Sequence, residues 1–170
     1  MNDTGYFELA LQQELAAAEE VVTGWILEGQ KEELALFRED LKIGEGPENE
    51  VTKLTPHQFA QLSAIAEDSD SVPVVINYLR YQIGRAKPDE GWRWHGIGEC
   101  LVTLLTKDVR EQAYMAASRA AGRVRGRGVG TSKEEKRQAW VALTCRFLAA
   151  LYRRFTQRAK DLDYRQEGTQ

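Results

Sequence analysis

The stretch SKEEKRQAWVALTCRFLAALYRRF, residues 132–155, decides the fold of this 170-residue chain. Ser132 and Glu135 have the spacing of a helix capping box, in which each side chain accepts a hydrogen bond from the backbone N–H of the other residue. After this predicted helix N-terminus, large apolar residues recur every three or four positions: Trp140, Leu143, Phe147, Leu151 and Phe155. The spacing lines one face of an α-helix, so we predict the longest helix of the chain here, ending near residue 162.

Two more helices are predicted between residues 55 and 84. Thr55, Pro56 and Gln58 combine a hydroxyl N-cap, a proline in the first turn and a reciprocal capping partner. The acidic turn EDSDS, residues 67–71, then separates this helix from a second one that ends at Gly84.

The next segments continue the helical pattern. Residues 85–91, RAKPDEG, read as an exposed loop, and apolar residues return at helical spacing from Ile97. Asp108 is expected to cap an alanine-rich helix over 109–121, which Gly122 ends. No stretch alternates polar and apolar residues as a half-buried strand does. The sequence therefore predicts an all-α protein, a compact bundle of about five to seven helices.

The charge is divided unevenly along the chain. Residues 1–50 carry 13 acidic and 3 basic side chains, whereas residues 51–170 carry 13 acidic and 20 basic ones. Helical patterns over 6–27 and 31–43 precede a glycine-rich linker at 44–51. We therefore divide the chain into an acidic N-terminal helical arm and a basic helical bundle core, and expect the basic part to face a polyanion.

Composition excludes several classes of protein. No run of about 18 apolar residues is present, and the N-terminus has no basic start followed by an apolar stretch. We therefore expect a cytoplasmic protein without a membrane partner. Cys100 and Cys145 are not paired in a CxxC motif, and we expect both to be free and reduced.

Few residues are suited to catalysis. The chain has two histidines, and only His95 stands near other chemically useful groups, in WRWHGIGEC. If that stretch is helical, His95 and Glu99 share a face, which is half of a metal site. We expect no metal, no cofactor and no enzymatic activity, because convergent groups are too few.

The basic residues are the more coherent set, and they fall into three groups. We assign nucleic-acid binding to the following side chains: Arg80, Arg85, Lys87 and Arg93; Arg119, Arg123, Arg125 and Arg127; Arg146, Arg153 and Arg154. Guanidinium groups pair with phosphate oxygens, and aromatic rings interleaved with the first group, such as Tyr81 and Trp92, can stack on bases. The glycine-rich segment 122–130 is expected to be mobile alone and to become ordered on RNA.

Three stretches resemble the small helical (Csm-type) subunit of type III CRISPR effector complexes. They are LTPHQ at 54–58, INYLRYQIGR at 76–85 and CRFLAALYRRF at 145–155. The second resembles a family helix that ends in a tyrosine, two variable residues and Gly-Arg, here Tyr81, Gly84 and Arg85. The WRWHGIGEC stretch and the GRVRGRG segment match nothing in that family.

The resemblance implies a non-catalytic, RNA-binding subunit of a ribonucleoprotein complex in antiviral defence. Such a subunit contacts the backbones of guide and target RNA and stacks against identical copies and other effector subunits. Arg85 is the one basic residue to which the resemblance itself assigns RNA binding. The other arginines are assigned to RNA binding from the distribution of charge.

Three alternative readings remain open. Residues 56–84 could form a DNA-binding helix-turn-helix that presents Asn77, Arg80, Tyr81 and Gln82 to a groove. The acidic and basic parts could instead pair with one another in a purely protein–protein homo-oligomer. An enzyme that uses His95 and Glu99, for instance a nuclease, is the weakest alternative.

Overall fold

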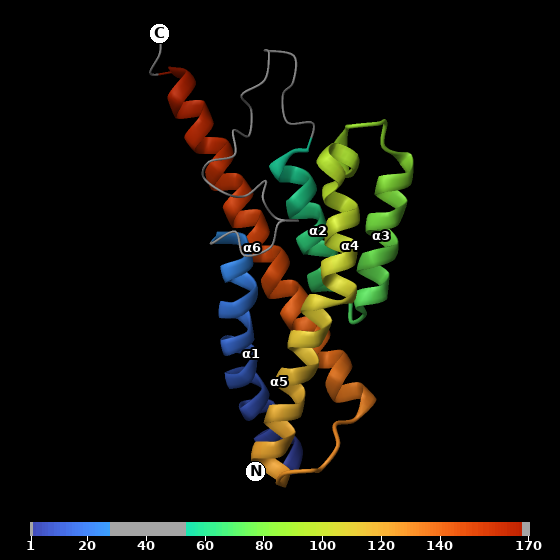
Figure 1. Cartoon of the computed structure of the whole chain (residues 1–170), viewed down its shortest axis with the longest axis vertical. Coiled ribbons are helices and arrows are strands. Elements are labelled where there is room, and N and C mark those ends of the chain that lie inside the picture. The colour runs from blue at the N-terminus through green and yellow to red at the C-terminus, as the bar shows by residue number, and fades with distance from the viewer. Residues whose placement is uncertain (1, 28–53, 168–170) are drawn as a thin grey trace.

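The longest helix, α6 (Lys133–Glu167), spans the bundle in the computed structural model, and three of the other helices pack extensively against it (Figure 1). The predicted capping box is confirmed. Ser132 Oγ accepts a hydrogen bond from the backbone N–H of Glu135 at 3.1 Å, and the Glu135 carboxylate accepts one from the N–H of Ser132 at 3.0 Å. The structure describes residues 2–27 and 54–167, with side chains as far as residue 157.

These residues form six α-helices, one short 3-10 helix and no strand, which confirms the predicted all-α bundle. In chain order they are α1 (Asp3–Leu27), α2 (Pro56–Asp68), α3 (Val72–Arg85), the 3-10 helix η2 (Gly91–Gly96), α4 (Ile97–Thr106), α5 (Asp108–Arg125) and α6. The helix predicted over 31–43 and the linker predicted over 44–51 lie outside the described residues. None of the described helices is both long and apolar enough to cross a bilayer.

Helix α6 joins two groups of helices through one apolar stripe. Helices α1 and α5 lie together on one part of α6, and α2, α3 and α4 form the other group (Figure 1). Phe147 of α6 meets Trp25 of α1 edge to face, with ring centroids 6.5 Å apart. Two turns further on, Phe155 stacks on Phe59 of α2 at 4.6 Å. The predicted aromatic spacing of α6 therefore supplies the core of both groups.

Helix α1 belongs to this bundle although it is the first half of the predicted acidic arm. It packs between α5 and α6 and buries Phe7, Leu11, Leu15, Val22 and Ile26. Its five carboxylates therefore lie on a helix whose position is fixed by apolar packing. The boundary at residue 50 falls outside the described residues.

Helices α2 and α3 form where the sequence predicted. Thr55 caps α2, and the Gln58 side chain accepts a hydrogen bond from the Thr55 backbone N–H at 2.9 Å. The EDSDS turn separates the two helices, since α2 ends at Asp68 and α3 begins at Val72. Both helices pack against α6, and an exposed loop follows α3 as expected.

The end of α5 differs from the prediction. Gly122 does not end this helix, which continues to Arg125, so only the part of segment 122–130 after Arg125 is a loop. The helix continues because Val124 packs against the core and Arg125 is held by ion pairs. An interior glycine costs only about 1 kcal/mol, which these contacts offset. The prediction that the whole segment is a loop was wrong.

The start of α5 also differs. Asp108 is the first residue of the helix, not its cap, and the preceding Lys107 makes no side-chain capping bond. Helix α4 ends at Thr106, so the two helices are separated only by Lys107. The carboxylate of Asp108 still lies in the first turn, where it interacts favourably with the helix dipole.

Gly98 sets how closely α4 approaches its neighbours. A Cβ at this position would lie 2.6 Å from the backbone oxygen of Trp92 and 2.7 Å from the side chain of Ile83. Glycine is thus needed for η2 and α3 to pack directly on the first turn of α4. In contrast, a Cβ at Gly122 would meet nothing within 4 Å.

Substitution by alanine is expected to change the free energy of unfolding in opposite directions at these two helical glycines. Gly98→Ala should lower the free energy of unfolding by about 1–3 kcal/mol, because the methyl group overlaps a backbone atom. Gly122→Ala should raise it by about 0.4–1 kcal/mol, because it removes backbone entropy from the unfolded chain without a clash. Urea unfolding monitored by circular dichroism measures both, and equal effects at the two positions would contradict this packing.

Candidate nucleic-acid interface

Three of the predicted RNA-binding arginines pair instead with helix α1. Arg123 lies 3.2 Å from Glu14, Arg125 lies 3.2 Å from Asp3, and Arg146 lies 3.2 Å from Glu19. Two of them also donate to α1 amides, Arg123 to Gln13 and Arg146 to Gln12, each at 2.7 Å. A phosphate would have to compete with these partners, so the structure separates these three arginines from the others.

Arg125 is the most firmly held member of this group. Its guanidinium forms a two-pronged ion pair with Glu135, with one hydrogen bond at 2.9 Å, and lies 5.1 Å from the centroid of the Phe7 ring. Glu135 is at the same time the capping partner of Ser132. This side chain therefore ties the end of α5 to the starts of α1 and α6.

The remaining C-terminal arginines are spread over α5, its following turn and α6. Arg119, Arg127 and Arg153 are exposed and form no ion pair among the described residues, whereas Arg154 is partly buried. Arg146 faces α1, so the predicted flank of arginines on α6 does not form one continuous free surface.

The first group of basic residues forms an exposed surface at the end of α3 and in the segment that follows. We call Arg80, Tyr81, Arg85, Lys87 and Arg93 the α3–η2 surface; all five are exposed, and none forms an ion pair with another described residue. Tyr81 is 63% exposed, and the Arg85 guanidinium lies 5.7 Å from the centroid of its ring. Arg93 donates to the Ala86 carbonyl at 3.3 Å, which fastens the loop.

The aromatic residues beside this surface divide between core and solvent. Trp92 is 2% exposed and meets Phe59 edge to face at 5.0 Å, so it is mainly a core residue. Tyr78 and Trp94 are partly buried against the core. Tyr81 is thus the ring that stands free for stacking on a base.

The WRWHGIGEC stretch is not one helix. His95 has φ of +48°, a left-handed conformation that interrupts the helical backbone two residues before α4 begins. His95 and Glu99 therefore do not share a helix face, and the half-site that the sequence suggested does not form. In the described part of the chain, no three His, Cys, Asp or Glu side chains are grouped as a metal site requires.

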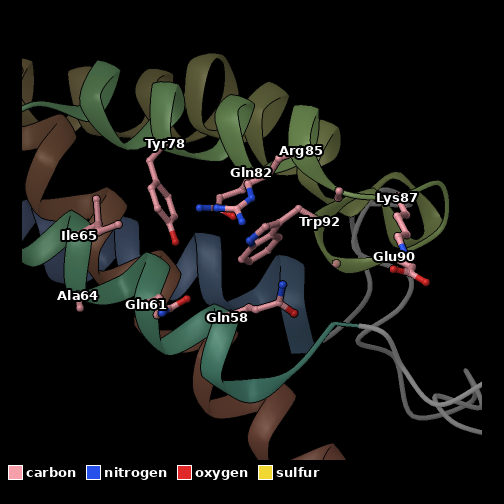
Figure 2. A pocket seen from close by; sticks show the side chains of 12 residues that line it. Gln58, Gln61, Ala64, Ile65, Tyr78, Gln82, Arg85, Lys87, Glu90 and Trp92 are labelled. Atoms are coloured by element: carbon pink, nitrogen blue, oxygen red, sulfur yellow. The ribbon is translucent and has the colours of Figure 1, made fainter.

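A cleft adjoins the α3–η2 surface, between α2, α3 and η2. It has a volume of about 910 Å³ and is lined by polar side chains of α2, of α3 and of the loop after α3, and by Gly91 and Trp92 of η2. In Figure 2, Tyr78 and Gln82 extend from α3 toward α2, from which Gln58 and Gln61 point back at them. Gln82 thus lines the cleft and is only partly exposed, whereas Asn77 and Arg80 are exposed. A DNA-binding helix-turn-helix would present all three side chains together.

Two arrangements escaped the sequence reasoning. The cleft brings together glutamines that are distant along the chain, which no short motif indicates. On α5 and α6, Arg110 lies 6.0 Å from the Tyr114 ring centroid and 5.8 Å from that of Trp140, while Lys136 lies 5.7 Å from that of Tyr114. The i,i+4 spacing of Arg110 and Tyr114 was the available signal, whereas the contacts between α5 and α6 join residues far apart in sequence.

Neither cysteine forms a disulfide, as expected. The Cys145 thiol donates to the carbonyl of Ala66 at 3.2 Å and so links α6 to α2. Burial raises the pKa of the Cys145 thiol, and the nearby Glu67 carboxylate adds to this effect. A thiol with a raised pKa is a poor nucleophile at neutral pH, so Cys145 is a packing residue.

The Arg125–Glu135 pair gives stability a specific pH dependence. The hydrogen bonds from Arg125 lower the pKa of Glu135 from 4.5 to about 2. Because the folded protein holds this carboxylate ionised, its contribution is present above pH 4.5 and is lost as the pH falls toward 2.

Glu135→Gln should isolate this contribution, because glutamine keeps the capping bond and removes the charge. The difference in unfolding free energy between wild type and variant should be largest above pH 5 and shrink steadily toward pH 2. Denaturant titrations at several pH values measure it, with Glu8→Gln, an exposed carboxylate of α1, as the control. A difference that does not change with pH would show that the ion pair contributes nothing.

Comparisons with protein-family models, curated proteins and solved structures found no match to this chain. What the chain binds is therefore inferred from its own residues. Among those described, the α3–η2 surface is a group of four exposed cations that form no ion pair with another described residue.

Proposed function

We propose that the chain is a non-catalytic, RNA-binding small subunit of a type III CRISPR ribonucleoprotein complex, and that the α3–η2 surface contacts the backbones of guide and target RNA. The observation that carries this proposal is the contrast between two sets of arginines. Those facing α1 are neutralised within the chain, whereas the four cations of the α3–η2 surface lie beside an exposed tyrosine and have no acidic partner among the described residues.

The chemistry of this surface suits a single-stranded polyanion. Guanidinium groups bind phosphate oxygens through two parallel hydrogen bonds, and an exposed ring such as Tyr81 stacks on any base. Residues 72–96 carry four basic side chains against the two carboxylates of Asp89 and Glu90, so the segment is net positive. Binding through phosphates would be strong at low salt and largely independent of sequence.

The arrangement of the helices supports the CRISPR part of the proposal. The stretches that resemble the small-subunit family lie at the start of α2, along α3 and in α6. These three helices pack against one another, so the matching residues belong to one connected part of the bundle. Tyr81, Gly84 and Arg85, the most specific part of the resemblance, fall on the last turns of α3 at the α3–η2 surface.

The proposal predicts that removing three cations of this surface weakens RNA binding in a salt-dependent way. The triple variant Arg80→Gln, Arg85→Gln and Arg93→Gln should reduce the slope of log Kobs against log salt concentration by about 2, at about 0.7 for each phosphate that is no longer neutralised. Fluorescence anisotropy with a labelled single-stranded RNA, measured from low to moderate salt, gives this slope.

A matched triple variant tests whether the position of the charges matters. Arg119→Gln, Arg127→Gln and Arg153→Gln removes the same net charge from exposed sites on α5, its following turn and α6. We expect its slope to stay close to that of the wild type. If this variant reduces the slope more than the first does, the RNA surface lies on the C-terminal arginines instead.

The role in an effector complex makes a separate prediction. Co-expressed with the larger subunits of a type III complex and a guide RNA, the chain should co-purify with the ribonucleoprotein in more than one copy. Quantitative mass spectrometry of the purified complex measures the copy number. Its exclusion from the complex, with RNA binding intact, would leave an RNA-binding protein of another kind.

A further inference from the structure

We propose that the cleft between α2, α3 and η2 is a binding site for one unpaired nucleotide of the RNA strand, whose base enters the cleft while its phosphate stays at the entrance. The inference rests on the proposed function and adds to it a base-binding site. The volume of the cleft, about 910 Å³, falls within the range of about 300–1,000 Å³ that is usual for small-ligand sites.

The first argument is the unused hydrogen-bonding capacity of the lining. Gln61, Gln82 and Tyr78 make no side-chain hydrogen bond to any described residue. Their amide and hydroxyl groups approach one another from opposite sides of the cleft (Figure 2). A glutamine amide presents one donor and one acceptor edge, which matches the paired donors and acceptors along the edge of a base.

Gln58 is a partial exception among these amides. Its side-chain oxygen accepts the Thr55 backbone N–H at 2.9 Å as part of the capping box. The side-chain nitrogen of Gln58, Nε2, remains available as a donor. It lies close to η2, since a Cβ at Gly91 would be 3.2 Å from it. The capping bond therefore fixes the orientation of Gln58 and leaves its nitrogen as a donor beside the cleft.

The second argument is the combination of flat and charged groups. The Tyr78 ring and the aliphatic Ile65 line the cleft and can contact a planar apolar face, while Trp92, which is 2% exposed, forms the buried floor beneath them. Arg85 and Lys87 also line it, against the single carboxylate of Glu90. A peptide segment would use the amides equally well but would not need cations at the entrance, whereas a nucleotide joins a planar, hydrogen-bonding base to a phosphate.

The third argument is continuity with the phosphate-binding surface. Arg85 belongs both to the α3–η2 surface and to the lining of the cleft. A strand whose phosphates follow Arg80 and Arg85 would therefore pass the mouth of the cleft. Gly98 contributes indirectly, because it allows η2 to pack on α4 and so places Trp92 at the cleft wall.

The test separates base binding from phosphate binding by using two strands of equal length, a single-stranded RNA and an abasic oligonucleotide with the same number of phosphates. The full-length wild-type chain should bind the RNA about tenfold more tightly than the abasic strand. Gln61→Met and Gln82→Met keep side-chain length and helix propensity but remove the amide. Each should weaken binding of the RNA about three- to tenfold and leave binding of the abasic strand unchanged.

Gln138→Met is the matched control, because Gln138 is exposed on α6 and lines a different groove, against α1. Thermal unfolding followed by circular dichroism is the control for folding, and all three variants should unfold as the wild type does. Equal affinity for the two strands, or equal losses with both, would overturn the nucleotide site while leaving the phosphate-binding proposal standing. Failure of the wild type to bind either strand would overturn both.

Discussion

The apolar stripe of α6 is the interaction on which the rest of the structure depends. Phe147 and Phe155 lie two turns apart on one helix, and each meets an aromatic residue from a different group of helices, Trp25 of α1 and Phe59 of α2. Neither group could bury its own apolar face without α6. Because Phe59 also meets Trp92, the same stripe fixes the floor of the cleft and the segment that carries Lys87 and Arg93.

Electrostatics within the chain determine which cations are available to a partner. Helix α1 is held by buried apolar residues, and three of its five carboxylates, those of Asp3, Glu14 and Glu19, pair with arginines of α5 and α6. Among the described residues, carboxylates of the acidic part pair with arginines of the basic part inside one chain. The excess of positive charge after residue 50 thus overstates the cationic surface that a nucleic acid would meet.

The α3–η2 surface and its cleft depend on local backbone geometry as well as on charge. Asp89, Gly91, His95 and Gly96 all adopt positive φ between the end of α3 and the start of α4. These turns bring the chain back so that η2 packs on both neighbouring helices, with Gly98 providing the close approach. Positively charged side chains and hydrogen-bonding amides consequently lie side by side, and we propose that the first set binds phosphates and the second a base.

The sequence by itself determined the helices, because capping residues and apolar spacing act over only a few positions. Ser132, Glu135, Thr55 and Gln58 predicted two helix starts correctly, and the α6 stripe predicted the core. Only the tertiary structure decided which arginines were neutralised, since Arg123 and Glu14 are 109 residues apart in sequence. Tertiary packing of Val124 also extended α5 beyond Gly122, where the sequence had predicted the end of the helix. The cleft could not be foreseen because its amides converge only when the consecutive helices α2 and α3 pack against each other and on α6.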